Sequence, residues 1–163
     1  MLLQSTLSLA LLLFSTATTA APVDAIAMGS KHNLYLMTCK PSRDCLLIIC
    51  GPDKSPYTAV GYFANGVSSG QSKRPTSTTV ISNPATSWDG ATKSGTIGAN
   101  AFTSTIDAGA SALAKGAIAG NATMGTEEFA CFRDGQAKIS VGGDLGDDDS
   151  SCTADYWCAS TQV

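Results

Sequence analysis

The sequence predicts a mostly β fold: a single-domain β-sandwich or small β-barrel of short antiparallel strands, with at most one short helix, held together by disulfides. Charged residues make up only 14% of the chain, and Ser, Thr, Gly and Ala are abundant, which favours sheets and turns over helical bundles. About eight short apolar or alternating runs are separated by turn residues, at the spacing typical of sandwiches and barrels. The third observation is the arrangement of the cysteines.

The cysteines predict three disulfides, at least one of which joins the two ends of the fold. Three lie upstream and three downstream of the cysteine-free segment 51–130, and three cysteines cannot all pair among themselves. Fifteen connectivities remain possible by counting. The six are Cys39, Cys45, Cys50, Cys131, Cys152 and Cys158. A zinc site is disfavoured because the chain has no CxxC motif and a single histidine, so no metal or other cofactor is expected.

Residues 1–20 are predicted to be a signal peptide, which leaves 21–163 as one secreted, disulfide-stapled domain. The apolar run from Leu7 to Phe14 is too short to span a bilayer, and Ala20 is a small residue where signal peptidase would cleave. A buried N-terminal core helix is the alternative interpretation. No later apolar run reaches spanning length. We therefore expect an extracellular, soluble monomer without a membrane span.

The charge pattern argues against nucleic acid as a partner. The net charge is −3, and the ten Lys and Arg residues are scattered mostly singly along the chain. A protein that binds nucleic acid or anionic lipid carries a basic patch or stripe. Neither class of partner is expected.

The first half of the domain is predicted to consist of strands joined by turns. In the first strand, Leu34 and Leu36 share one face, and Tyr35 and Met37 share the other. Asn65-Gly66 favours a turn, although a longer loop follows it. Strands are expected at 34–38, 45–50, 57–64 and 76–82, with turns or loops at 40–44, 51–56, 65–75 and 83–90.

The one helical signal covers residues 107–115 and follows two short strands. Ile106, Ala110 and Leu113 recur at positions i, i+4 and i+7, and Asp107 is able to cap the start of a helix. The pattern predicts a single helix of about two turns. The preceding strands are expected at 93–98 and 101–106.

The next strand, 117–124, carries a glycosylation sequon. The alternation predicts one inward and one outward face. The inward residues would be Ile118, Ala122 and Met124, and the outward residues Ala119, Asn121 and Thr123. Asn121-Ala-Thr123 has the pattern of an N-glycan acceptor. Glycosylation of Asn121 is therefore a hypothesis, and the protein would then be a glycoprotein.

The last quarter of the chain carries the remaining cysteines. Asp134-Gly135 separates two strand patterns, 127–133 and 137–141, and predicts a hairpin between them. An acidic loop follows, containing Asp144, Asp147, Asp148 and Asp149. Because these aspartates lack the alternating register of a calcium loop, a solvated loop is favoured over a calcium site.

Few residues suggest catalysis. His32 has no partner motif, so a surface histidine is the favoured interpretation. Glu127 and Glu128 are adjacent and would point to opposite faces of a strand. Glu128 paired with a distant aspartate would allow a hydrolase, and this alternative stays open. We do not expect an enzyme.

Aromatic residues give the candidate binding surface. Trp88 and Tyr156 could form a flat platform for a sugar or a partner protein, because their rings combine a large contact area with a polar edge. A carbohydrate-binding or cell-wall protein is thus a second alternative. Trp157 lies beside Cys158, and core packing against a disulfide is favoured for it.

Four segments resemble secreted cysteine-rich proteins of filamentous fungi, including elicitors from plant pathogens that induce the hypersensitive response. The segments are 57–63 (YTAVGYF), 87–90 (SWDG), 129–135 (FACFRDG) and 152–158 (CTADYWC). The resemblance implies a compact β-barrel effector with a role in virulence. Its partner would be a component of the plant apoplast or cell surface, and its perception would provoke defence responses or cell death. The family has no agreed active site, so no functional residue is carried over.

Overall fold

The computed structural model describes residues 30–42, 45–46, 49–66, 74–142 and 150–162. The proposed signal peptide and the acidic loop with its four aspartates lie outside these described residues. Within them, no helix has the length and apolar character needed to cross a membrane.

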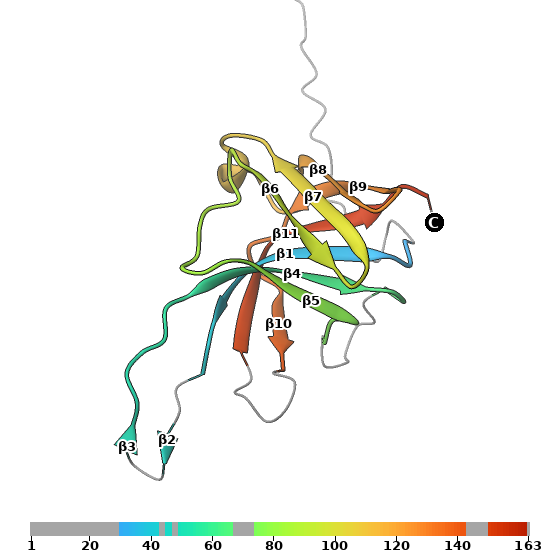
Figure 1. Ribbon diagram of the computed structural model, residues 1–163. Coiled ribbons are helices and arrows are strands. Elements are labelled where there is room, and N and C mark those ends of the chain that lie inside the picture. Colours follow the sequence, from blue (N-terminus) through green and yellow to red (C-terminus); the bar gives the residue numbers. More distant parts are fainter. Residues whose placement is uncertain (1–29, 43–44, 47–48, 67–73, 143–149, 163) are drawn as a thin grey trace, which may run out of the picture.

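The fold is mostly β, as predicted, and takes the form of a nearly closed, barrel-like antiparallel sheet (Figure 1). Eight strands follow the order β5-β4-β1-β11-β9-β8-β7-β6, and β10 pairs with β11 beside this path. The two edge strands, β5 and β6, lie close together: the Thr79 hydroxyl of β5 donates a hydrogen bond to the Thr96 carbonyl of β6 at 2.6 Å. A separate two-stranded sheet is formed by β2 and β3. The strands are β1 (Asn33–Lys40), β2 (Cys45–Leu46), β3 (Ile49–Cys50), β4 (Tyr57–Phe63), β5 (Ser77–Ser82), β6 (Thr92–Ile97), β7 (Asn100–Ile106), β8 (Ile118–Met124), β9 (Glu127–Arg133), β10 (Lys138–Val141) and β11 (Ser150–Ser160).

Apolar residues cover both faces of the central strands, as the sequence of β1 predicts. Leu34 and Leu36 belong to one buried cluster, and Tyr35 and Met37 belong to another. The first cluster draws side chains from β4, β1, β11, β9, β8, β7 and β6, so it fills the inside of the curled sheet. The second lies on the other face of β1, β4, β9, β10 and β11. Trp157 is in the second cluster, where it stacks on Phe132 with ring centroids 4.6 Å apart, which confirms core packing for this tryptophan.

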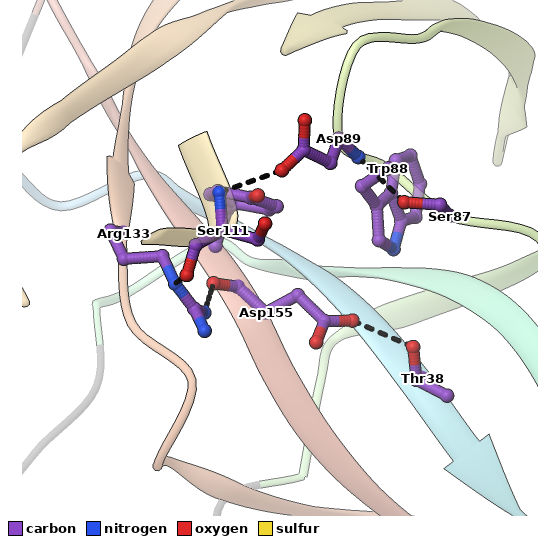
Figure 2. Close-up of a pocket in the computed structure, with 8 residues that line it drawn as sticks. Thr38, Ser87, Trp88, Asp89, Ser111, Arg133 and Asp155 are labelled. Carbon is purple, nitrogen blue, oxygen red and sulfur yellow. Dashed lines mark hydrogen bonds between the residues drawn. The ribbon is translucent and has the colours of Figure 1, made fainter. Parts of the chain in front are cut away.

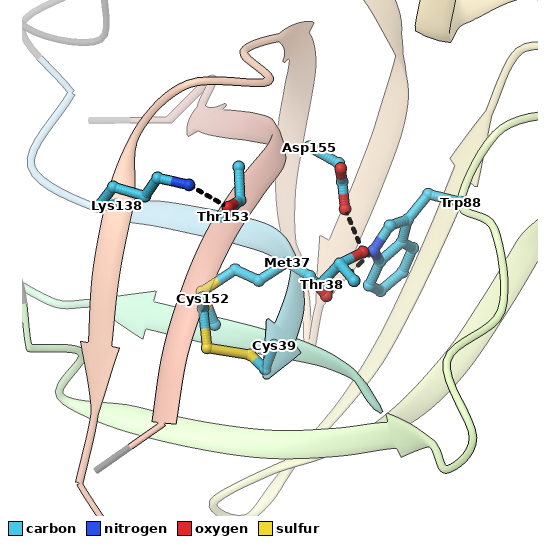
Figure 3. Close-up of a disulfide and its surroundings, with 8 residues drawn as sticks. All are labelled: Met37, Thr38, Cys39, Trp88, Lys138, Cys152, Thr153 and Asp155. Atoms are coloured by element: carbon cyan, nitrogen blue, oxygen red, sulfur yellow. Dashed lines mark hydrogen bonds between the residues drawn. A yellow bond between two sulfur atoms is a disulfide. The ribbon is translucent and has the colours of Figure 1, made fainter. Parts of the chain in front are cut away.

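Two disulfides hold the sheet between neighbouring strands. Cys39 of β1 bonds to Cys152 of β11, and these residues face each other directly in the antiparallel ladder (Figure 3). Cys131 of β9 bonds to Cys158 of β11 in the same way. The first bond joins the upstream and downstream groups of cysteines, as the cysteine count requires.

Two predicted elements are wrong. The apolar segment 45–50 is not one strand but two, with Cys45 opposite Cys50 in a short antiparallel ladder. The predicted helix 107–115 is reduced to a single 3₁₀ turn, η1 (Ala110–Ala112), preceded by Gly109 at φ 83°. Ile106, at the end of β7, and Ala110, in the 3₁₀ turn, both face the core. Their i, i+4 spacing therefore reflects two separate elements and not one face of a helix.

The inward pattern of β8 is correct from Ala122 onward but wrong at its start. Ile118 is 70% exposed and Ala119 is fully buried, the reverse of the expected order. The register with β9 shifts between Ile118 and Gly120, so a bulge inserts one extra residue and inverts the alternation. Gly120 adopts φ 148° at this bulge.

The predicted Asp134-Gly135 hairpin is also wrong. Both β9 and β10 pair antiparallel with β11, to different parts of that long strand, and not with each other. The dipeptide instead lies between β9 and β10, where the chain that pairs with β11 leaves the ladder for a few residues. There the Asp134 carboxylate accepts hydrogen bonds from the backbone N–H groups of Gln136 and Ala137, each at 3.1 Å. A turn-forming side chain therefore produces a kink along β11 without reversing the chain.

Candidate functional site

A small polar pocket lies where the end of β9, the middle of β11 and the loop between β5 and β6 meet (Figure 2). Its volume is about 130 Å³. Polar and charged side chains from five separate segments contribute to it. The lining residues are Thr38, Ser87, Trp88, Asp89, Ser111, Arg133, Asp155 and Tyr156.

Asp155 reaches the pocket because β11 bulges at this residue. Leu36 pairs with Tyr156 and Met37 pairs with Ala154, which leaves Asp155 without a partner in β1. Its Oδ2 accepts a hydrogen bond from the Thr38 hydroxyl at 2.7 Å. Burial raises the pKa of Asp155, while the Thr38 hydrogen bond and then the Arg133 charge oppose that rise. The bulge thus points a half-buried carboxyl, which favours its neutral form, into the pocket.

Arg133 connects the end of β9 to its surroundings. Its Nε donates to the Ser111 carbonyl at 3.2 Å, and its Nη1 donates to the Asp155 carbonyl at 2.6 Å. The guanidinium also lies over the Tyr156 ring, with 5.5 Å between Cζ and the ring centroid. These contacts place a permanent positive charge at the wall of the pocket, since an arginine does not lose its proton in proteins.

Asp89 holds the η1 turn. Its Oδ1 accepts the Gly109 N–H at 2.7 Å. Its Oδ2 accepts the Ser111 N–H at 2.8 Å (Figure 2). Hydrogen bonds from the Ser111 side chain, the Ser111 backbone and the Gly109 backbone lower the pKa of Asp89. Both oxygens therefore serve as structural acceptors, and the carboxylate stays ionised.

The two aromatic residues predicted as a binding surface line the same pocket, but neither is an open platform. Trp88 and Tyr156 are each only 2% exposed. Trp88 donates from Nε1 to the Met37 carbonyl at 3.4 Å, and the Lys93 ammonium lies 5.5 Å from its ring centroid. A ligand that needs a flat exposed ring would not find one here, so the platform interpretation is replaced by a pocket with aromatic walls.

The carboxylates considered for catalysis are separated by the fold. Glu127 lies 2.8 Å from Nδ1 of His32, an interaction that the sequence did not predict, and the His32 ring meets Tyr62 edge-on. Desolvation, with a smaller contribution from Glu127, raises the pKa of Tyr62. Glu128 lines a different pocket of about 450 Å³, the Glu128 pocket, and shares it with no aspartate. The carboxyl groups that do share a pocket are those of Asp89 and Asp155.

The sequon lies on the accessible face of β8. Asn121 and Thr123 are both exposed, as the alternation predicts, and both line the Glu128 pocket. Asn121 stands opposite Thr105 of β7 and Ala130 of β9. The acceptor side chain is thus accessible in the folded protein, and its glycosylation stays a prediction.

Among the residues that the structure describes, no cluster of three or more His, Cys, Asp or Glu side chains is arranged to hold a metal ion. The four aspartates weighed for calcium lie outside that set. Comparison of the chain with protein-family models, with curated proteins and with solved structures finds no match. The site must therefore be interpreted from its own geometry.

Sequence reasoning identified Trp88 and Tyr156 but missed the charged members of the pocket. Arg133 precedes the Asp-Gly dipeptide, and Asp155 lies within the last strand. In a regular strand, consecutive side chains such as those of Asp155 and Tyr156 point to opposite faces. Both line the pocket because β11 bulges at Asp155, and the bulge is visible only once β11 is paired with β1. The available signal was that Asp155 is the one charged residue of the last strand.

Proposed function

We propose that the protein is a secreted effector that plant tissue perceives, and that it acts by binding an apoplastic or cell-surface component, not by catalysis. Three features support the proposal: the signal-like leader, the resemblance to fungal elicitors and a small barrel locked by disulfides. A cross-linked fold of this kind suits an oxidising environment outside the cell. The partner of such a protein would recognise its folded surface.

The state of the pocket's charged groups is the observation that favours binding over catalysis. Both oxygens of Asp89 accept backbone N–H groups, and two nitrogens of Arg133 donate to backbone carbonyls. A general base must be free to accept a proton from the substrate. Since both oxygens of Asp89 are committed to the fold, Asp89 is a poor second catalytic carboxylate beside Asp155, and the geometry supports a recognition surface more strongly than a reaction centre.

The hydrolase alternative loses the residue on which it depended. Glu128 would have to act with a second carboxyl group at a suitable separation. In the structure, Glu128 lines the Glu128 pocket, whereas Asp89 and Asp155 line the smaller polar pocket. Any hydrolase proposal would have to move to Asp155, whose partner Asp89 is held by the η1 turn.

Infiltration of the purified mature protein into leaves tests the proposal. The oxidised protein should cause localised cell death or defence-gene induction. The same protein, reduced and alkylated, should lose that response, because the barrel is expected to open when its disulfides are removed. A Cys39→Ala/Cys152→Ala variant gives a destabilised sample without chemical treatment, and its response should be weaker than that of the oxidised wild type.

An empty-vector preparation from the same expression host is the matched control for contaminants. Absence of any response to the oxidised protein would contradict the effector proposal. An equal response to the folded and unfolded samples would contradict recognition of the folded surface, because the signal would then lie in a linear segment.

A further inference from the structure

We propose that the pocket formed by Trp88, Arg133, Asp155 and Tyr156 binds one neutral sugar ring, either a free monosaccharide or the terminal residue of a glycan. This inference concerns the pocket alone and does not depend on the response of plant tissue. It rests on an unpartnered hydroxyl, on the complementarity of the surrounding polar groups, and on the size and charge of the space.

The Tyr156 hydroxyl is the first observation. The side chain is 2% exposed and lines the pocket, and its hydroxyl makes no hydrogen bond to any other part of the chain that the structure describes. The hydroxyl oxygen is not one of the fully buried atoms without a partner, so it is open to the pocket, where water or a ligand is able to bond it. The hydroxyl therefore marks a position where a bound polar group would gain a hydrogen bond.

The surrounding groups match the dual character of sugar hydroxyls. Within the described residues, Asp155 uses only Oδ2 in a hydrogen bond, and Arg133 uses only Nε and Nη1. One carboxyl oxygen and one guanidinium nitrogen are thus left for a ligand. A sugar hydroxyl donates one hydrogen bond and accepts others, so a ring bearing adjacent hydroxyls is able to bind both groups at once.

Size and charge restrict the ligand class further. A cavity of about 150 Å³ holds a benzene-sized molecule, and this pocket measures about 130 Å³. A monosaccharide is larger than benzene, so only one edge of a single ring, with its hydroxyls, would enter this space, and a longer segment of a polymer would not. The pocket contains one guanidinium and two carboxyl groups. An anion would gain from Arg133 but would be repelled by the ionised Asp89, so a neutral ligand fits better.

The wall provided by Trp88 completes the arrangement. Its ring is buried and fixed by the hydrogen bond from Nε1 to the Met37 carbonyl. Aromatic side chains offer an apolar surface together with a polar edge. A site with few polar groups placed around a rigid aromatic wall has the usual composition of a small-molecule pocket.

Amide chemical-shift titration of the full mature protein tests the inference. The probes are glucose, galactose, mannose, xylose and N-acetylglucosamine, each as the free sugar and as its methyl glycoside. Sodium acetate and sodium sulfate are the anionic arms. At least one sugar should shift the amides of residues 87–89, 111, 133 and 155–156 in a saturable manner. For a ligand of one ring, the dissociation constant is expected to be on the order of millimolar.

Tyr156→Phe is the decisive variant, because it removes the unpartnered hydroxyl without taking a hydrogen bond from the fold. It should weaken sugar binding about tenfold. Asp155→Asn keeps an acceptor for the Thr38 hydroxyl and should also weaken binding, which gives a second readout. Tyr62→Phe removes a tyrosine hydroxyl outside the pocket and should leave the affinity unchanged.

The methyl glycosides distinguish the two sources of the sugar ring. Binding of the methyl glycoside as tightly as the free sugar would assign the site to a glycan terminus, and loss of binding on methylation would assign it to a free monosaccharide.

Three results would overturn the proposal. The first is the absence of saturable shifts at these amides with every sugar. The second is an unchanged affinity in Tyr156→Phe. The third is tighter binding of acetate or sulfate than of any sugar, which would make the pocket an anion site.

Discussion

Cys39 and Cys152 face each other across β1 and β11, and their disulfide closes the longest cross-link between described residues, with a sequence separation of 113. Thr38, next to Cys39, lies on the opposite side of β1 and bonds to Asp155 in the pocket (Figure 3). The strand that the disulfide fixes is therefore the strand that forms one wall of the pocket. Stability and the geometry of the site depend on the same pair of strands.

We predict that removing this disulfide costs more stability than removing the second one. Chain-entropy estimates scale with the closed loop, giving about 5 kcal/mol for Cys39–Cys152 and about 3.5 kcal/mol for Cys131–Cys158, whose sequence separation is 27. Urea unfolding of the two double Cys→Ala variants, followed by tryptophan fluorescence, measures both losses. Equal losses, or a larger loss for the shorter loop, would contradict the entropic origin of the difference.

Gly120→Ala should destabilise the fold by about 3 kcal/mol or more. Gly120 has φ 148°, and a Cβ at this position would collide with the Thr105 carbonyl oxygen of β7. Thermal unfolding measures the loss. Gly98→Ala is the matched control, since Gly98 also has a positive φ but has open space around its Cα. A comparable loss in the two variants would mean that backbone conformation, not the close approach of β7, sets the cost.

The general architecture could be predicted from the sequence because the patterns that determine it are local. The alternation in β1 and most turn residues between strands depend only on neighbouring positions, and the structure agrees with them except at Asp134-Gly135. The count of cysteines required a cross-link between the two ends, which Cys39–Cys152 provides. A small, mostly β, disulfide-bonded fold followed from these observations.

The wrong inward pattern of β8, the wrong Asp134-Gly135 hairpin and the missed Asp155 share a different cause, because each depends on how one strand pairs with another. The bulges at Ala119 and Asp155 appear only when β8 and β11 are aligned with their partners. Asp134-Gly135 has the local chemistry of a hairpin, but β11 is long enough to pair with the strands on both sides of it. The pocket depends on one of these bulges and was therefore only half visible in the sequence.

Glycosylation at Asn121 is expected when the chain is exported by a eukaryotic host. The side chain is exposed on β8, and Thr123 completes the sequon on the same face. Intact-mass measurement before and after treatment with an N-glycan-removing enzyme should show a glycan on the wild type. Asn121→Gln and Thr123→Ala should abolish it, whereas Thr123→Ser should retain it. An unchanged mass after enzyme treatment of the wild type would refute the assignment.

Asp89→Ala should loosen the η1 turn without unfolding the barrel. The lost carboxylate accepts the N–H groups of Gly109 and Ser111, so these two amides should exchange with solvent faster. Asp107→Ala removes an exposed carboxylate from the same region and is the matched control. Hydrogen-exchange NMR resolves the two sites. Unchanged exchange at Gly109 and Ser111 would show that the backbone holds the turn without Asp89.

The raised pKa of Asp155 should make the fold lose stability as the solution becomes less acidic. A carboxyl group whose pKa is higher in the folded than in the unfolded state binds its proton more tightly when folded. Its contribution is therefore fully present below the ordinary aspartate pKa of 3.8 and is lost as the pH rises through the higher folded value. Asp155→Asn cannot ionise, so its free energy of unfolding should increase relative to that of the wild type over this interval. Denaturant unfolding of both proteins between about pH 3 and about pH 7 measures the difference.

Thr38→Val sharpens the same test, because the Thr38 hydrogen bond lowers the pKa of Asp155 and opposes the effect of burial. Its removal should raise that pKa further and move the loss of stability to higher pH. Carbon-detected NMR of the Asp155 carboxyl follows the titration directly. A midpoint that falls in Thr38→Val, or a stability difference between wild type and Asp155→Asn that shrinks with rising pH, would show that desolvation does not dominate at the β11 bulge.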